Sequence, residues 1–176
     1  MKKAYLLALG LLAIPAMADN NQGFYLGVGV SSINDRQDDP VDTTSIRTGE
    51  VLGGYKYNDA LGIELRFGSS LKKGSSKDGL LERDIGNYQS IYYKPELVND
   101  EAKLYALLGY TTITSSVNIA TSVPADKEIS YSGASYGIGV GFVINKHFNV
   151  NFEFKNPCDK LYDKPNTASM NFDYRF

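Results

Sequence analysis

Cysteine, histidine and tryptophan are nearly missing from this sequence, and these side chains often build catalytic and metal sites. Its 176 residues include one cysteine (Cys158), one histidine (His147) and no tryptophan. One cysteine cannot form an internal disulfide, and one cysteine with one histidine does not make a zinc site. The sequence also has no Gly-rich phosphate-binding loop. We therefore expect no cofactor and no metal centre.

Long hydrophobic runs are missing after residue 18, and so is any excess of positive charge. The formal net charge is −2, and removal of Lys2 and Lys3 would make it −4. A mildly acidic chain gives no electrostatic reason to expect a nucleic-acid partner.

The one apolar run, residues 4–17, has the layout of a secretory signal peptide. It follows Lys2 and Lys3 and ends at the small residues Ala16 and Ala18. Its length of about 14 residues is short of the roughly 20 that a spanning helix needs, which disfavours an uncleaved anchor. We predict a cleaved signal peptide over residues 1–18 and a single domain over residues 19–176.

The rest of the chain alternates between apolar and polar residues with a period of two, which is typical of β-strands. One example is Phe24, Leu26, Val28 and Val30, which alternate with tyrosine, glycine and serine. Eight such segments lie at about residues 24–31, 50–57, 61–68, 87–96, 103–112, 136–142, 148–155 and 170–176. In the fourth segment, the facing is ambiguous, and we expect Ile91, Tyr93 and Pro95 on the apolar face and Lys94 opposite.

The connections between these segments alternate in length. Long polar connections are expected at about 33–46, 70–86, 112–132 and 156–166, and short ones at 58–60, 97–101 and 145–147. This pattern predicts an all-β fold, an eight-stranded antiparallel up-and-down transmembrane β-barrel. A soluble lipocalin-like barrel is the alternative, because alternation alone does not say which face meets lipid. Aromatic residues at strand ends favour the membrane barrel, as interfacial girdles: Phe24, Tyr55, Tyr57, Phe67, Phe142, Phe148 and Phe154.

The chain ends in Met-Asn-Phe-Asp-Tyr-Arg-Phe, and this ending resembles the recognition signal of outer-membrane barrels. The matching residues are Phe172, Tyr174 and Phe176. Residues 23–29 and 136–141 resemble the first and sixth strands of the small eight-stranded family that includes the OmpA transmembrane domain, OmpX and Ail. The resemblance implies export to the outer membrane of a Gram-negative bacterium. It also implies contact with outer-membrane lipid, lipopolysaccharide and the barrel-assembly machinery.

Charged residues at positions opposite the apolar face are expected to form an ion network inside the barrel. Four are acidic and four are basic: Glu50, Glu64, Glu153, Asp173, Lys56, Arg66, Lys155 and Arg175. Their estimated heights make Arg66 and Glu153 the central pair, so that loss of Glu153 would strand Arg66 at a cost of about 3–5 kcal/mol. An eight-stranded bore is narrow, and we expect this network to plug it.

The remaining candidates for chemistry are expected to be ordinary loop residues. His147 lies in a short turn and lacks the His-x-Ser-Asn pattern of lipid A deacylases. Cys158 follows Pro157 in a long connection, where we expect an exposed, incidental thiol. The first long connection holds four acidic residues without the pattern of an EF-hand calcium loop: Asp35, Asp38, Asp39 and Asp42. We expect no catalytic residue.

These observations favour a non-enzymatic monomer that displays its long connections outside the cell. Surface interaction, adhesion or envelope integrity would then reside in those connections, where an extracellular ligand could bind. A narrow pore for small solutes is the alternative. A lipid A-modifying enzyme is a third and weaker choice, because no base and nucleophile are evident.

The predicted cleavage site gives a direct test. N-terminal sequencing of protein purified from outer membranes should begin at Asp19. Recovery of soluble protein from the periplasm without detergent would contradict the membrane assignment.

Overall fold

The computed structural model describes residues 22–36, 43–72, 74–75, 81–119, 127–159 and 166–176 of the chain. The expected signal peptide, residues 1–18, and three of the four acidic loop residues, Asp38, Asp39 and Asp42, lie outside them. No helix in the described part of the chain is long and apolar enough to cross a membrane. The described strands are β1 (Gly23–Arg36), β2 (Thr43–Asn58), β3 (Leu61–Lys72), β4 (Gly74–Ser75), β5 (Leu81–Val98), β6 (Ala102–Ile119), β7 (Lys127–Val143), β8 (Phe148–Asn156) and β9 (Asn166–Arg175).

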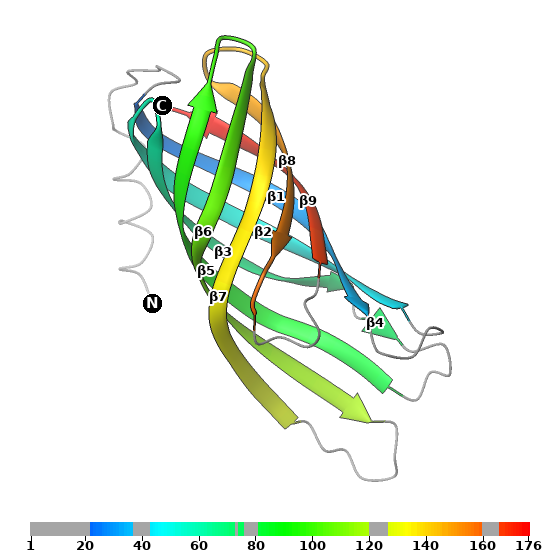
Figure 1. Cartoon of the computed structure of the whole chain (residues 1–176). Helices are drawn as coiled ribbons and strands as arrows, with labels where there is room; N and C mark the ends of the chain where they lie inside the picture. The colour runs from blue at the N-terminus through cyan, green and yellow to red at the C-terminus, as the bar shows by residue number, and fades with distance from the viewer. Residues whose placement is uncertain (1–21, 37–42, 73, 76–80, 120–126, 160–165) are drawn as a thin grey trace, which may run out of the picture.

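The strands form one closed antiparallel sheet in which neighbours in sequence are neighbours in space (Figure 1). The last strand, β9, pairs with β1, and β3 pairs with β5, so the sheet has no seam along its membrane-spanning part. The two-residue β4 pairs with the start of β5 and extends the edge that β3 begins. The predicted eight-stranded up-and-down barrel is therefore confirmed, with β4 as an addition to it.

The barrel has an apolar outside and a charged inside. Leu26 and Val28 on β1 are 51% and 57% exposed on the outer face, whereas Glu64 and Arg66 on β3 are fully buried. This arrangement is the reverse of a soluble barrel and suits a wall surrounded by lipid, where a closed sheet satisfies every backbone hydrogen bond. The expected facing of β5 is confirmed, since Ile91 is exposed on the outside and Lys94 is buried inside.

The strands run further than the alternation of the sequence indicates. The connections expected at 33–46, 70–86 and 112–132 are largely strand, because β1 continues to Arg36, β5 begins at Leu81 and β6 continues to Ile119. Only the connection expected at 156–166 agrees with the strand bounds. Beyond the membrane both faces of a strand meet water, so both become polar while the backbone pairing continues. Period-two alternation disappears there, and the segment looks like a loop.

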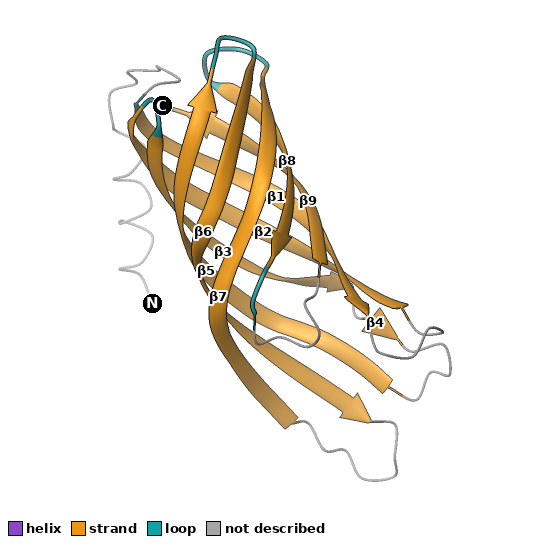
Figure 2. Cartoon of the chain, in the orientation of Figure 1, coloured by secondary structure: helices purple, strands orange, loops and turns teal. Residues whose placement is uncertain are grey.

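The two ends of the barrel differ. The short turns gather at one end, which we call the short-turn end (Figure 2). The strand ends at the opposite end of the barrel form what we call the long-loop end. At this long-loop end, β5, β6 and β7 run past the ends of β8 and β9 (Figure 1). We call their outer parts, residues 81–87, 113–119 and 127–133, the β5–β7 extension. The 18 residues of β6 span about 45 Å along the barrel axis at a tilt of about 40°, well beyond an apolar band of about 25 Å.

Inside the barrel, glycines make room for tyrosine rings on neighbouring strands. Four cross-strand pairs share this arrangement: Tyr25 with Gly54, Tyr88 with Gly68, Tyr92 with Gly109 and Tyr105 with Gly139. A Cβ atom added to any of these glycines would overlap the partner ring or lie against it. The rings therefore lie across the next strand, which carries their hydroxyl groups toward the centre of the bore.

A pair of alanine substitutions tests this packing. Gly54→Ala would overlap the Tyr25 ring and should lower the free energy of unfolding by about 1–3 kcal/mol. The neighbouring Gly53→Ala points outward, and its Cβ would lie 3.1 Å from the flexible tip of Leu26, so it should change stability by less than about 0.5 kcal/mol. Urea unfolding in detergent micelles measures both, and equal effects would contradict the packing argument.

Candidate functional site

The most unusual site in the described part of the chain is the barrel interior, where eleven of the described charged side chains are buried. Six are basic and five are acidic: Lys56, Arg66, Lys94, Lys103, Lys155, Arg175, Glu50, Glu64, Glu96, Glu153 and Asp173. The eight residues expected from the sequence are all among them. Lys94 was expected inside but not as part of the network, and Glu96 and Lys103 were missed. The alternation of faces along each strand could have identified both residues. Glu96 lies two positions from Lys94 and shares its face, and Lys103 is next to the outward-facing Leu104 and so faces inward.

Arg66 lies at the centre of this network. Its Nη1 and Nη2 atoms donate to the two carboxylate oxygens of Glu153, each at 2.7 Å. Nη1 also donates to Glu50 at 2.9 Å, and Nε donates to Glu64 at 2.6 Å. The guanidinium thus joins carboxylates from β2, β3 and β8. The expectation that loss of Glu153 alone would strand Arg66 is wrong, because two other carboxylates remain in contact with it.

Further contacts continue from Arg66 toward both ends of the barrel. Toward the long-loop end, the Nζ atom of Lys155 lies 3.2 Å from Glu50, which also accepts a 2.6 Å hydrogen bond from the hydroxyl of Tyr88. Toward the short-turn end, further ion pairs follow, among them Lys94 with Glu64 at 2.9 Å, Lys103 with Asp173 at 3.1 Å, Lys56 with Glu96 at 3.0 Å and Arg175 with Glu96 at 3.7 Å.

Tyrosine hydroxyls saturate the same carboxylates. Tyr105 donates to Glu153 at 2.7 Å, and Tyr25 donates to Glu64 at 2.7 Å. Both rings lie over glycines of the next strand, so the Gly–Tyr pairs and the ion network form one structure. A buried carboxylate is costly unless it is paired and hydrogen-bonded, and each of these two has both kinds of partner.

An apolar layer closes the interior on its long-loop side. Ile33, Ile46, Ile113 and Cys158 are buried against one another, and we call this layer the apolar cap. The chain after β8 turns inward at the barrel mouth, where Cys158 is fully buried and the amide of Asp159 donates to the carbonyl oxygen of Ala134 at 2.9 Å. The expectation of an exposed Cys158 is therefore wrong. The sequence shows where β8 ends but not that the following residues turn inward.

His147 has a structural environment. Its Nδ1 atom lies 2.9 Å from the carbonyl oxygen of Arg175, and its ring stacks on Tyr174 with 5.3 Å between centroids. It is half-buried rather than fully solvated. Within the described ranges, no three acidic, histidine or cysteine side chains gather in a way that could hold a metal ion.

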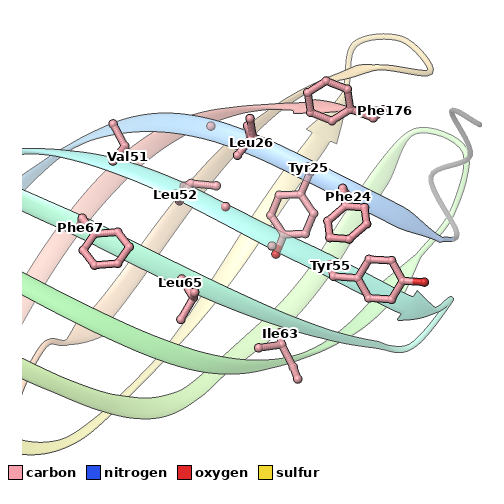
Figure 3. A pocket seen from close by; sticks show the side chains of 13 residues that line it. Phe24, Tyr25, Leu26, Val51, Leu52, Tyr55, Ile63, Leu65, Phe67 and Phe176 are labelled. Carbon is pink, nitrogen blue, oxygen red and sulfur yellow. The ribbon is translucent and has the colours of Figure 1, made fainter. Parts of the chain in front are cut away.

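The outer wall carries an apolar hollow of about 800 Å³ across β1, β2 and β3 (Figure 3). It centres on Gly53, whose cross-strand partners are Leu26 and Leu65, and where a missing side chain leaves space. Phe24 and Tyr55 pack together at one side with 4.7 Å between ring centroids. Such a surface suits lipid acyl chains.

The three residues of the expected assembly signal lie on the closing strand. Phe172 faces outward, and the ring of Tyr174 contacts those of Phe148 and Phe176. The amide of Phe176 donates to the carbonyl oxygen of Phe24 at 3.0 Å, at the junction where β9 meets β1.

Two charge-neutralising substitutions distinguish the centre of the network from one of its arms. Arg66→Gln would leave three carboxylates without their shared cation and should lower the free energy of unfolding by about 3–5 kcal/mol. Glu153→Gln leaves Arg66 paired with Glu50 and Glu64, and should cost about 1–3 kcal/mol. Denaturant unfolding in micelles compares the two, and a larger loss for Glu153→Gln would contradict the central role of Arg66.

Comparisons with known proteins agree with this geometry. A family model described as "Outer membrane protein beta-barrel domain" matches residues 4–176. A search of curated protein sequences gave no match.

Solved structures with the same fold cover most of the chain at low sequence identity. Ail of Yersinia pestis, solved with the heparin analogue sucrose octasulfate, aligns with a TM-score of 0.63 and 17% identity over 89% of this chain and 99% of its own. Neisserial surface protein A gives 0.67 and 12% over 88% and 97%. OprG of Pseudomonas aeruginosa gives 0.54 and 13% over 91% and 99%.

The family model covers nearly the whole chain, and the closed barrel has the inverted polarity that lipid requires. The chain therefore belongs to the outer membrane protein β-barrel domain family and resides in the outer membrane.

Proposed function

We propose that this protein is a closed, non-enzymatic barrel that acts through its extracellular surface, in surface interaction, adhesion or envelope integrity. The observation that carries the proposal is the interior, which is filled by the ion network and covered by the apolar cap. Eight strands leave a bore only wide enough for side chains. The lumen therefore stabilises the wall and does not serve as a channel.

The β5–β7 extension is the surface best suited to such contacts. Short turns of outer-membrane barrels face the periplasm, so the extension projects outside the cell. It is a continuation of paired strands rather than a set of separate loops, with hydroxyl contacts between β6 and β7. Thr112 and Ser132 lie 2.9 Å apart, and Thr114 and Ser130 lie 3.3 Å apart. A preformed sheet loses little conformational entropy when it binds a partner.

Partners of the proposed function are of two kinds. Outer-membrane lipid and lipopolysaccharide surround the wall, and an extracellular ligand contacts the long-loop end. Ail was solved with a heparin analogue, so ligand binding is compatible with this architecture. We further infer that Phe172, Tyr174 and Phe176 serve the barrel-assembly machinery and that the protein is a monomer.

A narrow pore is the second candidate, and one observation favours it. The amide atoms Asn149 Oδ1, Asn151 Oδ1 and Asn171 Nδ2 are buried without a hydrogen-bond partner among the described residues. Buried polar atoms of this kind usually bind water, so part of the periplasmic half of the lumen is wet. Arg66 with its three carboxylates, and the apolar cap beyond them, lie between this region and the outside. A lipid A-modifying enzyme is the weakest choice, because His147 contacts a backbone carbonyl and a tyrosine ring.

Planar-bilayer recording and a shortened variant test the proposal together. The purified protein should give no steady porin-like conductance. In the variant, residues 115–129 are replaced by an Asn-Gly turn that joins Thr114 to its cross-strand partner Ser130. Cells that display the variant should lose binding to a panel of immobilised matrix proteins, serum proteins and polysulfated glycans, while the barrel still folds.

A matched control alters the opposite end of the barrel, by replacing the exposed turn residues Asp100 and Glu101 with asparagine and glutamine. This control should retain all binding by intact cells. A large, steady conductance of the unmodified protein would contradict the closed barrel. Unchanged binding after removal of residues 115–129, which form the outer part of the β6–β7 hairpin, would contradict the role of the extension in surface contact.

A further inference from the structure

The membrane-facing wall carries two charges at one place. Among the outward-facing strand residues whose side chains the structure describes, Arg47 on β2 and Lys72 on β3 are the only charged ones. Both are exposed, and they are direct cross-strand partners. Like charges directly opposite each other in a sheet are destabilising, and within the described part of the chain no carboxylate pairs with either. Two adjacent cations of this kind are suited to bind an anion.

The position of this pair along the barrel indicates which anion it meets. Arg47 lies ten positions along β2 from Tyr57, at the periplasmic end of the same strand. At about 3.3 Å per residue and a tilt of about 40°, this separation is about 25 Å along the barrel axis, the height of the apolar band. The pair therefore lies at the level of the outer-leaflet headgroups, where the anions are lipid phosphates.

An apolar groove lies directly beside the two cations. It has a volume of about 690 Å³ and is lined by Val30, Leu71, Phe152 and Met170, with Arg47 and Lys72 among its other lining residues. Gly49, the cross-strand partner of Val30, has no side chain, and the side chain of Leu71 lies over it and lines the groove. A groove of this kind is complementary to an acyl chain, and the hollow around Gly53 differs from it in having no charged residue.

We propose that Arg47, Lys72 and this groove form a binding site for one phosphorylated, multiply acylated glycolipid of the outer leaflet, of the lipopolysaccharide class. The two cations bind a phosphate, and one acyl chain lies in the groove. The phosphate offsets the repulsion between the cations, so the site is complete only with its lipid. This proposal rests on the outer-membrane location and not on the proposed surface role.

Binding of lipid A to the protein in zwitterionic detergent micelles is the test. Native mass spectrometry compares bisphosphorylated lipid A with the same lipid after removal of both phosphates. The unmodified protein should bind the phosphorylated form about tenfold or more tightly. The double variant Arg47→Gln/Lys72→Gln should lose this preference, and Leu71→Asn should weaken binding of both forms. Lys146→Gln, which removes an exposed cation from a periplasmic turn, should change neither.

Stability without glycolipid separates a lost site from a lost fold. In micelles free of lipid A, the double variant should unfold at the same temperature as the unmodified protein or at a higher one, because a repulsion has been removed. Added lipid A should raise the unfolding temperature of the unmodified protein and of Lys146→Gln, but not that of the double variant. Equal binding of both lipid forms, an unaffected double variant, or an equal loss in Lys146→Gln would each overturn the proposal. None of these results bears on the closed lumen or on the β5–β7 extension.

Discussion

The contact of one guanidinium with three carboxylates is the interaction on which the rest of this barrel depends. Arg66 binds Glu50, Glu64 and Glu153, and thereby connects β2, β3 and β8 across the bore. The carboxylates alone would repel one another in a narrow, poorly solvated space. The arginine alone would be a buried charge without a partner. Glycines of the next strand let tyrosine rings lie across the wall, and those hydroxyls complete the hydrogen bonding of the same carboxylates. Backbone pairing between strands closes the wall. The Arg66 cluster allows the narrow interior to be filled with charged side chains without leaving any of these carboxylates unpaired.

Because the interior is filled, only the surfaces of the barrel are available for contacts with other molecules. With the bore occupied by the ion network and the mouth covered by the apolar cap, what remains available is the wall and the long-loop end. Among the hollows of the described wall, one lies in a mainly apolar surface and another is bordered by Arg47 and Lys72. The long-loop end has the β5–β7 extension, which keeps the regular pairing of the barrel outside the membrane. Paired strands therefore support both the wall and the long-loop end. The membrane boundary separates these two surfaces from each other.

The sequence predicted the part of the fold that lipid constrains and failed where lipid no longer acts. Inside the apolar band every outward residue must be apolar, so alternation identified the strands and placed Lys94 inside and Ile91 outside. Outside the band this constraint ends, and β6 was expected to stop near residue 112 although it continues to Ile119. The alternation of inward and outward positions was enough to predict which charged residues are buried, but it did not predict their partners. Pairing of Arg66 with Glu50 and Glu64 depends on the register of β2 and β3 and on rotamers, and the burial of Cys158 depends on a backbone path after β8. Neither the ion pairs nor this backbone path can be predicted from the spacing of residues in the sequence.

Charge balance links the inside and the outside of the wall. The interior holds one more cation than anions among its described residues, and the excess lies toward the periplasmic end, around Lys56, Lys94, Lys103 and Arg175. The buried amides of Asn149, Asn151 and Asn171 line the same region, and each has one atom without a hydrogen-bond partner among the described residues. Water that enters beside the short turns can hydrate both, because this region is the part of the ion network nearest to that end of the barrel. At the opposite end of the wall, Arg47 and Lys72 have no carboxylate partner among the side chains that the structure describes, and they face lipid instead of the lumen. In our proposal, water hydrates the interior cations and amides, and a phosphate headgroup binds Arg47 and Lys72 on the outside. The stability of this barrel is therefore a property of the protein together with its membrane, and a measurement in plain detergent omits one of its ligands.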